Sequence, residues 1–169
     1  MSAHPELLLG TVLAIAVYTD LAQRKVYNVL TYPALLAAVV WHTAAHGWLG
    51  LGFSLLGLTA GGLIFFPAFW AGGMGAGDIK LMAVVGAFLG WRFALNAALD
   101  AAVIGGVFAV VFLLVKRELW STLHRTLRLL FPGKTSGVAR SASYALPYAV
   151  FISLGAVAAF FLPSLIALP

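Results

Sequence analysis

The chain has 169 residues, of which 63% are hydrophobic and only 9% are charged. Soluble domains carry charge at about a quarter of their positions, so this composition excludes an ordinary soluble domain and predicts one membrane-embedded domain over residues 1–169. The net charge of +5 does not indicate a nucleic-acid partner, because the basic residues lie between apolar runs. The chain has no cysteine, which excludes disulfides, thiolate nucleophiles and cysteine-based metal sites.

Six apolar stretches predict membrane-crossing helices, at about 5–21, 30–47, 51–72, 79–96, 98–116 and 143–168. The runs are continuous and rich in Leu and Ala, whereas strands of a membrane barrel alternate apolar and polar residues. The first run is shorter than the roughly 20 residues that span a bilayer, so its flanking residues must extend the helix. No basic residue precedes it and no cleavage site follows it, so we expect it to be retained. The expected fold is all-α, a polytopic membrane helix bundle.

The orientation of the bundle follows from its Lys and Arg residues, which concentrate in cytoplasmic loops. We expect the connections 20–29, 73–80 and 116–142 to face the cytoplasm. That side then holds nine of the ten basic residues, namely Arg24, Lys25, Lys80, Lys116, Arg117, Arg125, Arg128, Lys134 and Arg140. Only Arg92 lies on the other side. This bias predicts an even number of crossings, with both termini outside.

The longest polar connection contains an amphipathic stretch at residues 117–131. Leu119, Leu123 and Leu127 recur at helical spacing, opposite Arg125 and Arg128. This pattern is typical of a helix that lies in the membrane interface. We expect it to anchor the chain to anionic lipid on the cytoplasmic side, and the alternative is that it guides a substrate.

Two of the five acidic residues can meet at one face of the membrane. Asp20 ends the first predicted helix, and Asp78 begins the fourth. The chain crosses twice between them, so both lie at the cytoplasmic boundary. Asp100 falls just after an outer turn, most of a membrane thickness away, with Arg92 as its expected partner. Because an ionised carboxylate at membrane depth costs several kcal/mol, Asp20 and Asp78 are the candidate functional residues.

Four glycines precede Asp78 within six residues, namely Gly72, Gly73, Gly75 and Gly77. Glycine lets another backbone approach closely, and a protease that cuts a membrane helix needs this approach for the extended peptide. The hypothesis is therefore that substrate backbone reaches the acids here. The alternative is a tight turn whose Asp caps the following helix.

Two converging carboxylates indicate a definite chemistry. At about 4 Å and an effective dielectric near 20, their repulsion is roughly 4 kcal/mol, so near neutrality they hold one proton between them. The ionised member then activates a water, and the protonated member polarises a peptide carbonyl and protonates the amine. No metal or cofactor is needed. The four histidines, His4, His42, His46 and His124, are interpreted as interfacial polar residues.

Lys80 has three possible roles. It can form a salt bridge with Asp78, extend its stem to the lipid headgroups, or bind a substrate carboxylate. These alternatives stay open from the sequence.

The residues around both acids resemble those of the type IV prepilin peptidases. Gly75-Ala76-Gly77-Asp78-Ile79-Lys80 matches the Gly-x-Gly-Asp-x-Lys motif of that family. The stretch from Asp20 to Thr31, which includes Asn28, resembles the motif of the family's first aspartate. Residues 145–156, with Pro147 followed by aromatic and small residues, resemble its last helix.

This resemblance implies an aspartyl endopeptidase of the inner membrane, whose active site faces the cytoplasm and removes the short basic leader of prepilins or pseudopilins. The catalytic residues carried over are Asp20 and Asp78, with Gly75, Gly77, Lys80, Asn28 and Pro147 as motif or substrate-binding positions. Tyr27 stands where the family often has Pro. Larger members carry an extra cysteine-containing region and also methylate the new amino terminus, so the chain resembles the short, peptidase-only form of Flp or tight-adherence pilus systems.

Three other interpretations compete with this one. Presenilin and signal-peptide-peptidase enzymes also use Gly-x-Gly-Asp, but they are larger and have Tyr where this chain has Thr19. A small proton-coupled transporter or channel component would use Asp20 and Asp78 as a relay, with carboxylates that lead to both faces. A membrane scaffold would pair Asp78 with Lys80 for structural purposes only.

Overall fold

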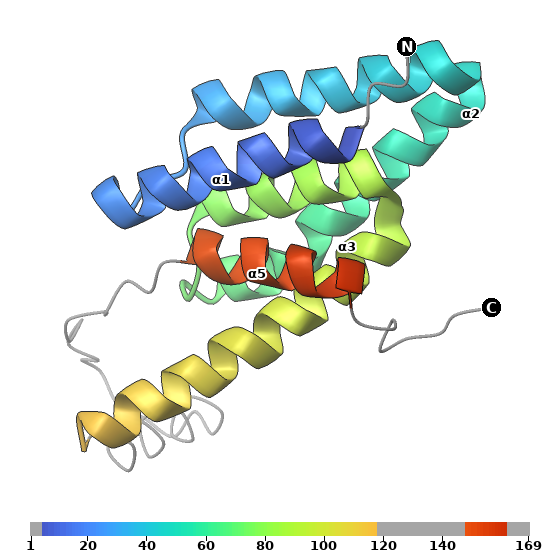
Figure 1. Ribbon diagram of the computed structural model, residues 1–169. Helices are drawn as coiled ribbons and strands as arrows, with labels where there is room; N and C mark the ends of the chain where they lie inside the picture. Colours follow the sequence, from blue (N-terminus) through green and yellow to red (C-terminus); the bar gives the residue numbers. More distant parts are fainter. Residues whose placement is uncertain (1–4, 118–147, 162–169) are drawn as a thin grey trace. The chain divides into compact units, whose positions relative to one another are not determined.

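The structure, a computed structural model, describes residues 5–117 and 148–161. These residues form four helices and no strand: α1 (Pro5–Gln23), α2 (Asn28–Trp70), α3 (Ala76–Val115) and α5 (Tyr148–Phe161) (Figure 1). The prediction of an all-α fold is confirmed. The predicted interfacial helix at 117–131 and the motif residue Pro147 lie outside the described residues, except for Arg117.

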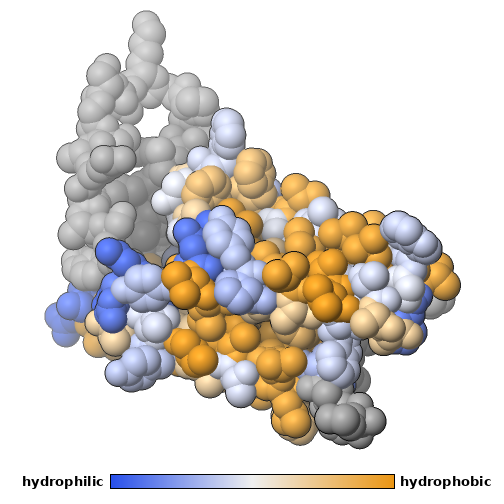
Figure 2. All heavy atoms as spheres, turned by 90° about the horizontal axis from the view of Figure 1, so that it is seen from above, coloured by the Kyte–Doolittle hydropathy of each residue, from blue (hydrophilic) through white to orange (hydrophobic). Residues whose placement is uncertain are grey.

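The described helices are apolar enough for a bilayer. α1, α2 and α3 are each long and apolar enough to cross a membrane, and α5 is a shorter apolar helix. Large apolar side chains such as Leu7, Val29, Trp48 and Trp70 are exposed, and hydrophobic residues cover much of the face shown in Figure 2. Because lipid contacts such surfaces without penalty, these exposed residues indicate a membrane protein of several crossings.

The chain divides into two compact units, residues 1–104 with 147–169, and residues 105–146. In the first unit, α1 packs against both α2 and α5 (Figure 1). In the second, the described residues include the end of α3, where the rings of Phe108 and Phe112 stack with centroids 6.2 Å apart. The prediction of a single domain stays a prediction.

Two glycines interrupt the long helices. Gly47 breaks α2 with φ 59° and ψ −137°, and Gly90 breaks α3 with φ 84° and ψ 168°. Residues with a side chain rarely adopt these conformations. The break in α2 lies at the predicted boundary near residue 47. The boundary predicted at 96–98 is wrong, because the chain is helical there and the Leu- and Ala-rich sequence after Gly90 offers nothing to end a helix.

Side chains from α2 satisfy the backbone at the break in α3. His42 Nε2 lies 2.9 Å from the carbonyl oxygen of Phe88, and Ser54 Oγ donates to the carbonyl of Ala87 at 3.0 Å. Carbonyls in the last turn before a helix break lack helical partners, and in lipid each unpaired one costs several kcal/mol. His42, interpreted from the sequence as an interfacial residue, therefore has a structural role.

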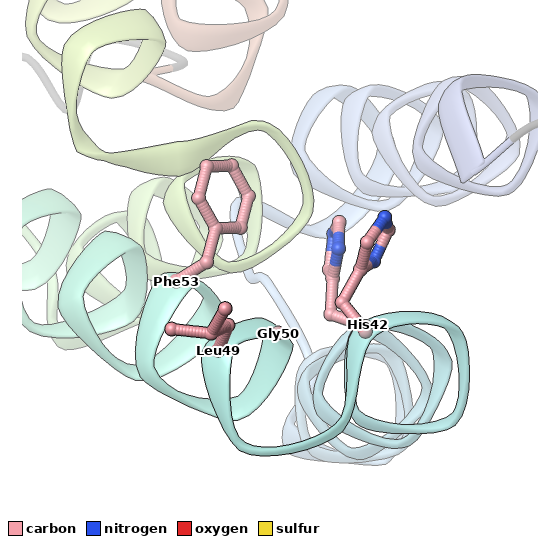
Figure 3. Close-up of a pocket in the computed structure, with 5 residues that line it drawn as sticks. His42, Leu49, Gly50 and Phe53 are labelled. Carbon is pink, nitrogen blue, oxygen red and sulfur yellow. The ribbon is translucent and has the colours of Figure 1, made fainter.

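A cavity of about 370 Å³ lies beside this break. It is lined by His42, His46, Leu49, Gly50 and Phe53 (Figure 3). The ring of Phe53 packs 5.0 Å from that of His42, centroid to centroid. None of these five residues is acidic, so among the described residues the cavity is separate from the carboxylates that the sequence singles out.

The second part of α2 and the first part of α3 touch through glycines. A Cβ atom built on Gly57 would overlap the carbonyl oxygen of Gly86, and one built on Gly61 would overlap that of Met82. Small residues spaced by four let membrane helices pack backbone to backbone, where no hydrophobic force draws them together. This contact places the first turn of α3, and with it Asp78.

We expect Gly57→Ala to lower the stability of the protein, because the added methyl forces the two backbones apart. Overpacking of this kind costs about 1–3 kcal/mol. The matched control is Gly52→Ala on the same helix, where a Cβ atom would meet nothing within 4 Å. Thermal unfolding in detergent measures both variants, and an equal midpoint for the two would contradict the close packing.

Candidate active site

Asp20 lies in the last turn of α1 and is held by the start of α5. Its side chain is 6% exposed, and its Oδ2 atom accepts a hydrogen bond of 3.1 Å from the backbone N–H of Ala149. The N–H groups in the first turn of a helix have no partner within the helix and favour a negative charge. The carboxylate of Asp20 therefore occupies a position that the start of α5 stabilises.

Asp78 lies in the first turn of α3 and is 8% exposed. Its Oδ2 atom accepts a hydrogen bond of 3.2 Å from the backbone N–H of Gly75, and its own N–H donates to the carbonyl of Gly75. This arrangement is one half of a capping box, in which the third residue of a helix reaches back to the residue before the helix; Gly75 has no side chain to form the other half. The alternative in which Asp78 caps α3 is thus observed, and it fixes the direction of the carboxyl group.

The fold brings these two acids together from distant parts of the chain. Asp20 and Asp78 interact electrostatically although they come from α1 and α3. Both carboxyl groups are buried, and each receives a backbone N–H group from a different segment. The convergence expected from the parity of the crossings is therefore present in the fold. The catalytic role of the pair stays a prediction at this point.

Gly77 makes room for the protein's own chain. A Cβ atom built on Gly77 would lie 2.9 Å from the Cβ atom of Val26, in the connection between α1 and α2. A Cβ atom on Gly75 would lie 3.1 Å from Oδ2 of Asp78. At these two positions an added methyl group would crowd Val26 and the Asp78 carboxylate. Gly77 thus lets the connection after α1 approach the start of α3, and a role of these glycines in admitting substrate backbone stays a prediction.

Lys80 is joined to α2. Its Nζ atom donates a hydrogen bond of 2.7 Å to Oδ1 of Asn28 and lies 4.9 Å from the ring centroid of Tyr32. The structure shows Asn28 as the hydrogen-bond partner of Lys80, and not Asp78, which the sequence offered as one alternative. The contact ties the start of α2 to the second turn of α3 and links two predicted motif residues. Tyr32 was not predicted to take part.

Sequence reasoning also missed Tyr148 and Ala149 at the start of α5. Ala149 holds Asp20 through its backbone, and Tyr148 interacts electrostatically with Asp78. The sequence did contain a signal for Tyr148, because it is the aromatic residue directly after Pro147 in the stretch that resembles the family's last helix. No role was predicted for it. Asp100 is 8% exposed and lies in α3 beyond the Gly90 break.

We expect the Lys80 to Asn28 hydrogen bond to show up as coupling in a double-mutant cycle. Lys80→Met keeps the stem and removes the donor, and Asn28→Ala removes the acceptor. The double variant should lose less stability than the two single losses added together, by about 0.5–1.5 kcal/mol. Thermal unfolding in detergent provides the measurement, and strictly additive losses would show that the bond contributes nothing.

Gly77→Ala should also destabilise the protein, because the new methyl group meets Val26. A second substitution, Val26→Gly, removes the obstructing Cβ atom and should restore part of the loss. Gly10→Ala is the control, since a Cβ atom there meets nothing within 4 Å. If Val26→Gly gives no recovery in the unfolding midpoint, the close contact between the two residues does not set the cost.

The sequence was compared with those of known proteins. Residues 7–110 match the type IV leader peptidase family. The chain is 32% identical to a prepilin leader peptidase/N-methyltransferase of Aeromonas salmonicida strain A449 over 119 residues, which are 66% of the chain and 40% of that protein. It is 31% identical to the protein of the same name from Aeromonas hydrophila over 119 residues, 66% of the chain and 41% of the relative.

A third relative, the prepilin leader peptidase/N-methyltransferase of Dickeya chrysanthemi, is 29% identical over 130 residues, which are 70% of the chain and 43% of the relative. The chain thus matches about two fifths of the length of these curated relatives. No solved structure gives a significant match.

Proposed function

Because the chain belongs to the type IV leader peptidase family, we propose that it is an aspartyl endopeptidase of the inner membrane that removes the short basic leader peptide from prepilins or pseudopilins. The observation that carries this proposal is the buried pair of Asp20 and Asp78, which interact although they come from α1 and α3. The proposal concerns peptidase activity alone, since a pair of carboxyl groups supplies acid and base for hydrolysis.

The reaction needs one proton shared by the pair. The ionised carboxyl group accepts a proton from a water molecule as the water oxygen bonds to the carbonyl carbon of the scissile peptide. The protonated carboxyl group hydrogen-bonds to the carbonyl oxygen, on which negative charge develops. When the carbon–nitrogen bond breaks, a proton passes from the pair to the leaving amine. The water supplies one oxygen and one hydrogen of the new carboxyl group, its other hydrogen balances the one given to the amine, and the pair returns to its starting state.

The backbone hydrogen bonds prepare the pair for these steps. Asp20 uses its Oδ2 atom for Ala149, and Asp78 uses its Oδ2 atom for Gly75. Each of these bonds engages one oxygen of its carboxyl group and fixes the direction of that group. Groups whose direction is fixed before the substrate binds need no reorganisation during the reaction. The starts of α5 and α3 therefore hold the two carboxyl groups in place.

Six crossings, with the pair at the cytoplasmic face, form part of the proposal. α2 has 43 residues, and at 1.5 Å per residue it would be about 65 Å long, twice the hydrocarbon core of about 30 Å. The chain folds back at Gly47, because Gly50 packs against the backbone of His42 (Figure 1). α3 has 40 residues and a break at Gly90, and its two parts are proposed to form two further crossings. α1 and α5 complete the six, and Arg24 and Lys25 beside Asp20 mark the cytoplasmic side.

Replacement of either acid by its amide tests the proposal. Purified wild type should cleave a candidate prepilin in detergent, and Asp20→Asn and Asp78→Asn should each lose on the order of 10³-fold or more in rate, because Asn keeps the shape but cannot exchange the proton. Cleavage is followed by the change in size of the prepilin.

Asp100→Asn is the matched control for this experiment, since Asp100 is equally buried in α3 but lies beyond the Gly90 break. It should retain cleavage. Continued processing by Asp20→Asn or Asp78→Asn would reject the catalytic pair. Failure of the wild type to cut any of several leader peptides would instead favour a transporter or a scaffold.

A further inference from the structure

Tyr148 stands beside both acids. It is the first residue of α5 and directly precedes Ala149, whose N–H group donates to Asp20. Its half-buried side chain interacts electrostatically with Asp78. Two adjacent residues of α5 therefore interact with the two acids, Ala149 through a backbone hydrogen bond to Asp20 and Tyr148 electrostatically with Asp78.

The hydroxyl group of Tyr148 lacks a hydrogen-bond partner among the described residues. A tyrosine hydroxyl usually finds a hydrogen-bond partner when its ring is buried. Within residues 5–117 and 148–161, by contrast, no hydrogen bond joins the Tyr148 hydroxyl to Asp78 or to another group. The hydroxyl and the carboxyl group interact electrostatically, and no direct hydrogen bond joins them.

Resting on the peptidase function above, we propose that Tyr148 is a third catalytic group, whose hydroxyl donates a hydrogen bond to the carbonyl oxygen of the peptide bond that is cut. As the water oxygen bonds to the carbonyl carbon, the electron pair of the C=O double bond moves to that oxygen. Tyr148 stabilises the resulting charge and keeps its own proton. The proton that reaches the amine still comes from the acid pair, so the balance of the reaction is unchanged.

This role differs from packing in a measurable way. A donor aimed at the oxygen where charge develops acts mainly in the transition state, and the loss of one such donor lowers kcat by about 10²–10³-fold. A ring that only fills space would be replaced by phenylalanine without loss. A ring that only binds the substrate would change KM and leave kcat unaltered.

The test is Tyr148→Phe, assayed on a synthetic peptide that contains a prepilin leader. We expect kcat to fall about 100-fold with KM and the unfolding midpoint unchanged. The control is Tyr18→Phe, the same substitution two residues before Asp20 on a side chain that is 72% exposed, and it should keep the wild-type rate. A kcat within about twofold of wild type, or a change in KM alone, would overturn the proposal.

A second measurement covers the case in which Tyr148→Phe unfolds. Fluorinated tyrosines at position 148 keep the ring and make the phenol a stronger hydrogen-bond donor. A kcat that changes with phenol acidity would support the proposal, and a kcat independent of acidity would overturn it.

The Asp20→Asn and Asp78→Asn variants separate the two claims. If both are inactive while Tyr148→Phe is fully active, the peptidase function stands and the role of Tyr148 fails. If wild type cuts no leader peptide, both fail.

Discussion

The demand that every backbone polar group be paired in lipid governs this structure. An N–H group at the start of a helix has no partner within its own helix, and a buried carboxylate needs donors. The protein satisfies both needs together, because Asp20 takes the N–H of Ala149 and Asp78 takes that of Gly75. The two carboxyl groups, which would be costly to bury in a membrane, thus accept hydrogen bonds at the starts of α5 and α3. Their position follows from where these two helices start.

Close glycine contacts then fix the position of α3. In lipid, helices are not drawn together by a hydrophobic force, so backbone contact and hydrogen bonds must hold them. Gly57 lies against Gly86, and Gly77 lies against Val26. The first contact fixes α3 against α2, and the second brings the chain that leaves α1 up to the turn that carries Asp78. The position of Asp78 relative to Asp20 therefore depends on glycines, because the lack of a side chain at these positions permits the close contacts.

Much of this arrangement could be predicted from the sequence, and the missing parts share a cause. Composition indicated helices in a membrane, and counting crossings placed Asp20 and Asp78 on one side. Counting does not say which way a side chain points around a helix. The partner of Lys80 is Asn28, far away in the sequence, and Tyr148 belongs to a segment whose approach to Asp78 depends on how α5 packs against α1. The break at Gly90 was missed because apolar length alone defined that boundary.

The way the acids are held also explains the composition of the motif around Asp78. Because the donors are backbone N–H groups, no neighbouring side chain is needed to orient the carboxyl groups, and any side chain at Gly75 or Gly77 would occupy space that the Asp78 carboxylate or Val26 already fills. The chemistry therefore requires two acids and bare backbone next to one of them. A short run of glycine and aspartate is sufficient to build half of the site, and the fold supplies the other half from the end of α1 and the start of α5.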